Sequence, residues 1–308
     1  NQGLDDNGIP QFKDMAKAFG LADTGYSTMA AFLDYDKDND LDVYILTNAL
    51  ETYNRNTLRP KITNGSAKSN DRLYRNNGDN TFTNVNQEAG ITIEGWGLGV
   101  CITDINQDGW SDIYVANDFV SNDLIWVNQK DGTFKDMAND YLKLQTHNGM
   151  GVDIADYNND MLPDIVVLDM LPEGNYREKM MIANGNYDKQ QMRREMGFGD
   201  QYMRNTLQLN QGKSPDGSIR FSEIGFLSNI SKTDWSWAPL IADYDNDGHK
   251  DLFIANGYRK DVTNMDYILY NQQTTVMNMF GTEKAKEERI QEQMKKGLDN
   301  LEEVKVSN

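Results

Sequence analysis

Four copies of one nine-residue acidic pattern constrain the fold of this chain more than any other feature. Each copy reads D-x-[DN]-x-D-x-x-x-D, and the copies occupy residues 34–42, 104–112, 156–164 and 243–251. Carboxylates this close together would mainly repel one another unless a cation held them. A hard cation such as Ca2+ takes six or more oxygen ligands. The pattern therefore predicts four cation-binding loops.

The predicted ligands come from the same five positions of each loop. Positions 1, 3, 5 and 9 would bind through side-chain oxygen, and position 7 through its backbone carbonyl. Up to four Ca2+ would bind, one in each loop. The twenty residues, in chain order, are Asp34, Asp36, Asp38, Asp40, Asp42, Asp104, Asn106, Asp108, Trp110, Asp112, Asp156, Asn158, Asp160, Leu162, Asp164, Asp243, Asp245, Asp247, His249 and Asp251.

Each loop is predicted to join two buried strands of a hairpin. In an EF-hand, position 12 would be a bidentate Glu and helices would flank the loop. Position 12 is instead Ile45, Val115, Val167 or Ile254, inside a short apolar run, and another apolar run precedes each first Asp. Such runs are typical of buried strands. A solvated acidic turn would explain one such loop, but four with the same flanks favour a metal-binding hairpin.

A second predicted hairpin alternates with the metal loop. It begins at Asn1, Asn76, Asn128 and Asn210, each time with a turn rich in Gly, Asp and Asn and a following strand that contains Phe. The shortest repeat runs about 52 residues, from Asn76 to Asn128. Four strands at that period are typical of a β-propeller blade, which must stack on its neighbours to bury both faces. We therefore expect an all-β propeller of four-stranded blades with helical insertions.

Departures from the common pattern rank the four predicted sites. Position 6 favours Gly because the loop turns sharply there. It is Gly109 in the second loop and Gly248 in the fourth, Asn39, which tolerates such a turn, in the first, and Met161 in the third. A left-handed Met161 would cost roughly 1–2 kcal/mol. Asn at position 3 leaves loops two and three with three acidic side-chain ligands, against four in the other loops. We expect the third site to be the weakest.

The repeat resembles the FG-GAP, or VCBS-type, calcium-loop family, whose loop reads D-x-D-x-D-G-x-x-D and whose propeller is also found in the integrin α-subunit head. The resemblance covers about residues 1–258. Segments such as DMLPEGNYREKM and QYMRNTLQLNQG look like the large VCBS-repeat surface proteins of Bacteroidota, often grouped with an ASPIC/UnbV module. The resemblance implies calcium-binding blades, usually seven, in an exported cell-surface protein. It implies no single chemistry, because a propeller hosts many functions.

The predicted organisation is a propeller region over residues 1–258 and a helical insertion over 259–308 that leads into a further blade. Asn1 lies inside a hairpin unit, and the chain stops at VKVSN, where the next hairpin is expected. Both ends favour part of a larger propeller of about seven blades. A four-bladed ring closed by the first hairpin is the alternative.

Composition limits the partners and the compartment. A net charge of −18 and the lack of a basic stripe exclude a general nucleic-acid binder. Calcium loops of extracellular affinity fill only where Ca2+ is millimolar, and the single Cys101 has no disulfide partner, so the expected location outside the cell rests on calcium. The resemblance to Bacteroidota surface proteins further implies a Gram-negative outer membrane. No apolar run is long enough to span a membrane, and a lipid anchor upstream of Asn1 is compatible with the sequence.

Extra length is concentrated after the second strand of three repeats, at residues 48–70, 169–205 and 257–308. Antiparallel geometry places these insertions on the face opposite the metal loops, which makes that face the candidate for binding a protein partner or a glycan. The insertion at 169–205 contains six of the fifteen Met. We expect these Met to pack the insertion onto its own blade. The last insertion is predicted to contain a charged helix from about Thr282 to Glu303.

Aromatic residues mark the expected insertion face. Tyr26, Trp96, Asn148 and Trp235 each stand eight residues before a metal loop, and Trp237 follows two residues after the last of them. Rings at the mouth of a propeller could stack on a ligand, although Tyr and Trp at a core edge are also common. The ligand-face candidates are therefore Tyr26, Trp96, Trp235 and Trp237.

Catalysis has little support in the sequence. The two histidines are His147 and His249, and the latter lies inside a metal loop. No nucleophile elbow, zinc motif or phosphate loop occurs. We therefore expect a non-catalytic binding or scaffold module. The family resemblance implies that it is an accessory to outer-membrane nutrient uptake. The alternative is a calcium-dependent polysaccharide lyase or glycoside hydrolase on the same scaffold, although no carboxylate pair for it can be picked out.

Overall fold

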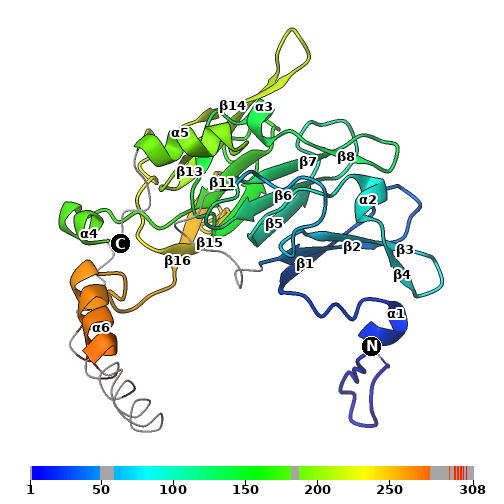
Figure 1. Cartoon of the computed structure of the whole chain (residues 1–308). Coiled ribbons are helices and arrows are strands. Elements are labelled where there is room, and N and C mark those ends of the chain that lie inside the picture. Colours follow the sequence, from blue (N-terminus) through cyan, green and yellow to red (C-terminus); the bar gives the residue numbers. More distant parts are fainter. Residues whose placement is uncertain are drawn as a thin grey trace.

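The chain folds almost entirely into antiparallel β structure. The computed structural model describes residues 2–48, 59–181 and 187–277, together with six separate residues between 291 and 303. Within this part of the chain no helix is both long enough and apolar enough to cross a membrane. The helices are short, apart from α6, and lie outside the sheets (Figure 1).

Three four-stranded sheets and one two-stranded sheet follow one another along the chain. The first contains β1 (Ser27–Leu33), β2 (Asp42–Thr47), β3 (Arg72–Asn76) and β4 (Phe82–Asn84). The second contains β5 (Gly97–Thr103), β6 (Asp112–Asn117), β7 (Leu124–Asn128) and β8 (Phe134–Asp136). The third contains β10 (Gly151–Ala155), β11 (Asp164–Leu168), β13 (Thr206–Lys213) and β14 (Ile219–Glu223), and the fourth β15 (Ser236–Ala242) and β16 (Asp251–Asn256).

The remaining elements connect or flank the sheets. Two short strands, β9 (Gln145–Thr146) and β12 (Gln201–Tyr202), pair in parallel. The helices are α1 (Ala16–Phe19), α2 (Asn86–Ala89), α3 (Ala138–Tyr141), α4 (Asn175–Met180), α5 (Tyr187–Glu195) and α6 (Met265–Met277).

The predicted order of hairpins is confirmed. Each metal loop joins the first two strands of a sheet, and its last residue pairs with the residue that precedes the loop, as Asp42 does with Leu33. The second hairpins form β3–β4, β7–β8 and β13–β14. The hairpin predicted at Asn1 is a small one closed by the bridge between Leu4 and Pro10, outside the four sheets.

The four sheets stack face to face in an open row, with the first sheet at one end and the fourth at the other (Figure 1). First strands lie next to first strands: β1 contacts β5, β5 contacts β10, and β10 contacts β15. Glycine permits this approach, because a Cβ on Gly99 would lie 3.0 Å from Cα of Gly151, and one on Gly151 would lie 2.2 Å from the carbonyl of Trp237. The closed four-bladed ring is not what the described residues form.

Alternate residues of each inner strand serve two different cores, as the period of a strand requires. Ile113, Val115 and Trp126 pack against the first sheet, around Tyr44 and Leu46. The neighbours of these residues on the other face of the second sheet pack against the third sheet; they include Tyr114, Ala116 and Ile125. A third core joins the third and fourth sheets around Val166, Leu168, Leu207, Ile241, Leu252 and Ile254.

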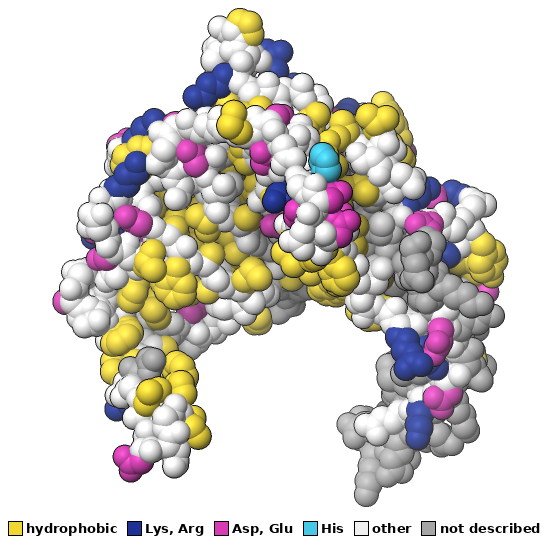
Figure 2. Space-filling model, turned by 180° about the vertical axis from the view of Figure 1, so that it is seen from behind, with side chains coloured by type: hydrophobic (Ala, Val, Ile, Leu, Met, Phe, Trp, Pro, Cys, Tyr) yellow, Lys and Arg dark blue, Asp and Glu magenta, His cyan; other side chains and the backbone are white. Residues whose placement is uncertain are grey.

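The prediction that every loop joins two buried strands is wrong at both ends of the row. Strand β1 is largely exposed, with Phe32 at 61% exposure, and Phe253 in β16 is 59% exposed. In the part of the chain that the structure describes, these strands have a neighbouring sheet on one side only, so the same apolar pattern meets solvent on the other. Figure 2 shows hydrophobic side chains at the surface beside a cluster of acidic ones.

The helix predicted from about Thr282 to Glu303 lies mostly outside the described residues. Gln291, Lys295, Gly297 and Asp299, which are described, are helical. The insertion at 48–70 is described at residue 48 and from residue 59 onward, and these residues contain no helix or strand.

Candidate metal centres and insertion face

All four acidic loops have the same backbone conformation. Position 6 is left-handed in each, including Met161 at φ 69°, as the sharp turn predicts. Position 4 is left-handed as well, which the sequence did not indicate because no glycine stands there. The residues at position 4 are Lys37, Gln107, Asn159 and Asn246, with φ between 54° and 63°.

The carboxylates at positions 1 and 5 of each loop accept hydrogen bonds from the loop's own backbone. In the second loop, Asp104 accepts from the N–H of Asp108 at 2.9 Å and from that of Gly109 at 2.7 Å. Asp108 accepts from the N–H of Trp110 at 3.0 Å. The third and fourth loops repeat this scheme, and the first repeats it in part. These bonds hold negatively charged oxygens on the inner side of a tight turn.

The aspartate at position 9 ties the metal loop to the third strand of its sheet. Asp112 is buried, and its two oxygens accept from the N–H of Ile105 at 3.0 Å and of Asn128 at 2.9 Å. Asp42 and Asp164 bond in the same way to the residues of their own sheets. Burial raises the pKa of Asp112 to about 7 and that of the other two to about 6. The side chain therefore has a structural role besides any metal ligation.

The first loop fits a hard cation best. Asp34, Asp36 and Asp42 bring one carboxylate oxygen each to within 4.8 Å of one another. Oδ1 atoms of Asp34 and Asp36 are buried without a hydrogen-bond partner, and so is Oδ1 of Asp40, which was expected to bind through its carbonyl only. A buried anionic oxygen without a donor is unfavourable unless a cation satisfies it.

The other three loops differ in how closely they gather ligands. In the fourth, Asp243, Asp245 and Asp247 bring oxygens together as in the first loop, while Asp251 is exposed and outside that group. The second loop has a buried, unpartnered Oδ1 on Asn106 and an ion pair of 3.2 Å between Lys130 and Asp108. These arrangements fit a cation, with Lys130 as a competitor in the second loop.

The third loop satisfies its own ligands. The amide of Asn158 donates to Oδ2 of Asp160 at 2.9 Å, so two predicted ligands already pair with each other. Asp156 and Asp164 are not gathered with Asp160 into a close carboxylate group among the described residues. This pairing adds a physical reason to expect weak binding there, although the ranking of the sites stays a prediction.

The insertions meet one another on the face opposite the loops. The backbone N–H of Lys61 bonds to the carbonyl of Met196 at 3.0 Å, and its ammonium donates to Oδ1 of Asn122 at 2.8 Å. Gln201 donates from its side chain to the carbonyl of Ser121 at 2.9 Å. Segments from the first, second and third repeats therefore form one continuous surface.

The four aromatic candidates do not converge on that surface as rings open to a ligand. Trp96 is 2% exposed and packs edge-on against Phe119, so it belongs to the core. Trp235 is half-buried and lies edge-on to Tyr258, with centroids 4.6 Å apart. Tyr26 and Trp237 are 43% and 38% exposed. The expected ring of four stacking residues is wrong for Trp96, because the insertion after β11 brings Phe198 over it.

The prediction that the methionines of the 169–205 insertion pack it onto its own blade is confirmed in part. Met170 and Met181 are buried beside Met150, and Met196 packs against the cluster that contains Trp96. Met192 is 49% exposed on α5. The insertion thus contacts more than its own sheet and leaves part of α5 open to solvent.

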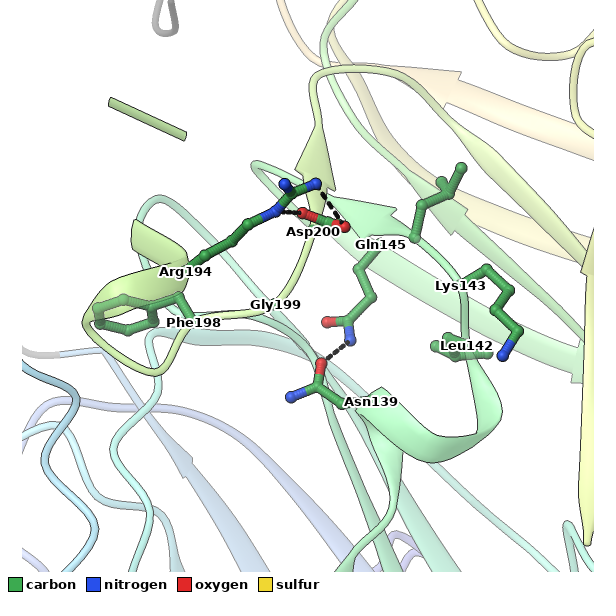
Figure 3. A pocket seen from close by; sticks show the side chains of 9 residues that line it. Asn139, Leu142, Lys143, Gln145, Arg194, Phe198, Gly199 and Asp200 are labelled. Carbon is green, nitrogen blue, oxygen red and sulfur yellow. Dashed lines mark hydrogen bonds and ion pairs between the residues drawn. The ribbon is translucent and has the colours of Figure 1, made fainter. Parts of the chain in front are cut away.

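A pocket of about 290 Å³ lies between α3 and the segment that follows α5 (Figure 3). Figure 3 shows the ion pair of Arg194 and Asp200 on one side and the hydrogen bond from Gln145 to Asn139, 3.2 Å long, on another. The lining contains a single carboxyl group, that of Asp200. The pair of carboxyls that a glycosidase uses is therefore not assembled in this pocket.

Neither histidine lines this pocket. His147 is 5% exposed, and its Nδ1 lies 2.7 Å from Oδ1 of Asn148. Burial, with the charge of Arg193 nearby, lowers the pKa of His147 to about 4, so the ring is neutral at pH 7. His249 lies in the fourth metal loop and donates its backbone N–H to Asp247 at 2.8 Å.

The sequence did not lead us to expect a buried hydrogen bond between a tyrosine and an aspartate that recurs in two sheets. The hydroxyl of Tyr44 donates to Asp71 at 2.9 Å, and that of Tyr114 donates to Asp123 at 2.8 Å. Each Asp also accepts a backbone N–H from the end of the second strand of its sheet. The signal was present, because an Asp or Asn stands directly before each third strand: Asp71, Asp123 and Asn205.

Comparison with known families agrees with this repeated architecture. Residues 62–115 and 104–167 each match the model of the FG-GAP-like repeat. The two overlapping matches contain the second and third metal loops, so the chain contains FG-GAP-like repeats. No curated protein matches the chain. The closer likeness to Bacteroidota surface proteins and the binding of calcium stay predictions.

Proposed function

We propose that these FG-GAP-like repeats are blades of a calcium-stabilised β-propeller that acts as an extracellular binding or scaffold module. The observation that carries the proposal is the recurrence of one loop conformation in all four sheets, with buried ligand-position oxygens in the first two loops that no protein group satisfies. Four sheets stacked through their first strands suit a propeller, in which blades surround a common axis.

Ca2+ would be held by the side chains at positions 1, 3, 5 and 9 and the carbonyl at position 7 of each loop. The ion supplies positive charge to a site where three or four acidic side chains crowd together. The protein contributes the turn that gathers them and the aspartate at position 9, which connects the site to the third strand. Calcium would thus stabilise each sheet at the hairpin that begins it.

Melting curves test the calcium proposal. We expect EGTA to lower the melting midpoint steeply and added Ca2+ to restore it, because a ligand of the folded state stabilises that state by mass action. Calorimetry should count up to four ions. Asp79→Asn, in an exposed turn outside the metal loops, is the matched control and should respond like the unchanged protein. An unchanged midpoint in EGTA would refute structural calcium.

The partner, a protein or a glycan, is proposed to bind the insertion face. Support comes from the contact of the 48–70 and 169–205 insertions with each other and with the short connection between β6 and β7. The 169–205 insertion also has exposed side chains, with Tyr176 at 74% and Tyr187 at 73% exposure. We propose that this face serves an accessory role in outer-membrane nutrient uptake, at the cell surface of a Gram-negative bacterium.

Binding assays with surface variants test the face assignment. Replacing residues 176–200 with a short linker should abolish binding, but it also removes Arg177, which forms an ion pair with Asp234. The double change Tyr176→Ser with Tyr187→Ser alters the exposed surface alone and should weaken binding while the calcium-dependent melt persists. Loss of binding on changing the turns at Asp79 or Asp131 would instead place the site on the other face.

A polysaccharide panel tests the non-catalytic proposal. New reducing ends or unsaturated products, lost in a variant of the metal loops, would favour the lyase or hydrolase alternative instead. Binding without product supports the scaffold function.

A further inference from the structure

We infer that the residue at position 4 of each metal loop couples that loop to the next one along the row, so that cation binding at neighbouring loops is cooperative. The inference rests on the proposed calcium function and adds a regulation to it. Position 4 is not among the expected metal ligands, and the loop pattern assigns it no role.

The contacts between loops follow one rule. Gln107, at position 4 of the second loop, donates from Nε2 to the carbonyl of Met161, at position 6 of the third, at 2.5 Å. Asn159, at position 4 of the third loop, donates from Nδ2 to the carbonyl of Gly248, at position 6 of the fourth, at 3.0 Å. These are direct bonds between successive metal loops.

The first two loops are joined by a different interaction at the corresponding place. The ammonium of Lys37, at position 4 of the first loop, lies 4.4 Å from the ring centre of Trp110, at position 7 of the second. An ammonium over an indole ring is attracted to it. All three successive pairs of loops are therefore linked through position 4.

The peptide between positions 6 and 7 explains how the link affects the site. Its carbonyl accepts the bond from the preceding loop, while its N–H donates to the aspartate at position 5, as Leu162 does to Asp160 at 2.9 Å and His249 to Asp247 at 2.8 Å. Position 5 and the carbonyl of position 7 are both expected ligands. A bond from one loop thus orients the peptide that lies between two ligands of the next.

The link also acts in the reverse direction. Position 4 stands between the ligands at positions 3 and 5 of its own loop, so a cation bound there fixes the backbone that presents the linking side chain. Coupling free energies between two binding sites are reciprocal. Filling one loop should therefore raise the affinity of the neighbour on either side by about threefold, the effect expected of one exposed hydrogen bond.

A double-mutant cycle on loops two and three tests the coupling. Tb3+ serves as the probe, since Trp110 lies at position 7 of the second loop and can sensitise its emission there, and Ca2+ competition confirms the site. Asp156→Ala disables the third loop. We expect it to weaken Tb3+ binding at the second loop by about threefold in the unchanged protein and to have no effect in the Gln107→Gly background. Gly removes the side chain and accepts the left-handed backbone without strain.

The matched control is Asn246→Gly, at position 4 of the fourth loop, which no further loop follows among the described residues. It should leave the coupling of loops two and three unchanged. Equal effects of Asp156→Ala with and without Gln107 would overturn the inference. Failure of Tb3+ and Ca2+ to bind any loop would overturn the proposed function instead, and hydrogen exchange at the Leu162 amide in EGTA, expected to be faster in Gln107→Gly than in Asn246→Gly, would still test the contact.

Discussion

The second and fourth sheets share one sequence pattern, but equivalent residues are buried in the second sheet and exposed in the fourth. Tyr114 and Phe253 both stand two residues after the ninth position of a metal loop, and they are 1% and 59% exposed. The aspartates at that ninth position differ in the same way: Asp112 is fully buried and Asp251 is exposed. The difference arises because the second sheet has a sheet on both sides, whereas the fourth has one on a single side within the described residues.

The comparison teaches that this repeat has no core of its own. Each strand presents one face to the preceding sheet and one to the following sheet, so the burial of a residue depends on whether a neighbour is present. The ninth-position carboxylate depends on its neighbours too, because its second hydrogen bond comes from a third strand. Among the described residues, the fourth sheet has two strands.

The largest expected effect is the loss of a buried ring in an inner sheet. Tyr114→Ala should lower the free energy of unfolding by about 3–5 kcal/mol, since it opens a cavity between two sheets. Phe253→Ala, at the equivalent position, should change it by less than about 1 kcal/mol. Urea unfolding of both variants measures the difference. Equal losses would show that Phe253 is covered in solution.

The next largest expected effect is that of removing the ninth-position carboxylate, which should destabilise the second sheet more than the fourth. In EGTA, Asp112→Ala leaves two buried N–H groups without an acceptor and should destabilise the protein by about 1–3 kcal/mol. Asp251→Ala should have little effect under the same conditions. With Ca2+ present, both variants should lose calcium-dependent stabilisation, and Asp251→Ala should lose more than Asn158→Ala. A silent Asp112→Ala in EGTA would contradict the structural role of this side chain.

The buried Tyr–Asp pairs of the first and second sheets predict a pH dependence. Burial raises the pKa of Asp71 and Asp123 from the ordinary value of 3.8 to about 7. Between about pH 4 and 7 the folded state holds protons that the unfolded state releases, so the free energy of unfolding should fall as pH rises through that range.

Melting in EGTA at pH 5 and pH 8 measures this effect. The double variant Asp71→Asn with Asp123→Asn cannot ionise at these positions and should flatten the fall in the midpoint. A slope equal to that of the unchanged protein would show that other carboxyls, such as those of the metal loops, dominate.

The smallest expected effect concerns the left-handed position 6. Met161→Gly should stabilise the protein by about 1 kcal/mol, because glycine accepts φ of 69° without steric cost. Asn39→Gly is the matched control and should gain less, since asparagine tolerates the left-handed region. Thermal melting in EGTA compares the two variants without the contribution of calcium. A loss of stability in Met161→Gly would mean that the methionine side chain stabilises the loop.

Much of the fold was predictable from local pattern. The hairpins, their order and the sharp turn at position 6 follow from apolar runs, turn residues and the acidic spacing, all of which act over a few residues. The aromatic candidates were less predictable: Trp96 and Trp235 occupy equivalent positions, yet one is in the core and the other is half-buried beside Tyr258. Their surroundings come from insertions distant in the sequence.

The sequence by itself determined the repeat, the order of the hairpins and the sharp turn at position 6 of each loop, because turn geometry and strand period are local properties of the chain. Tertiary structure alone decided which faces are buried, which carboxylates are desolvated and which loops touch. Those properties depend on the stacking of one sheet on another. The bond from Gln107 to Met161 illustrates this, since the two residues are 54 positions apart and meet only when the second and third sheets pack together.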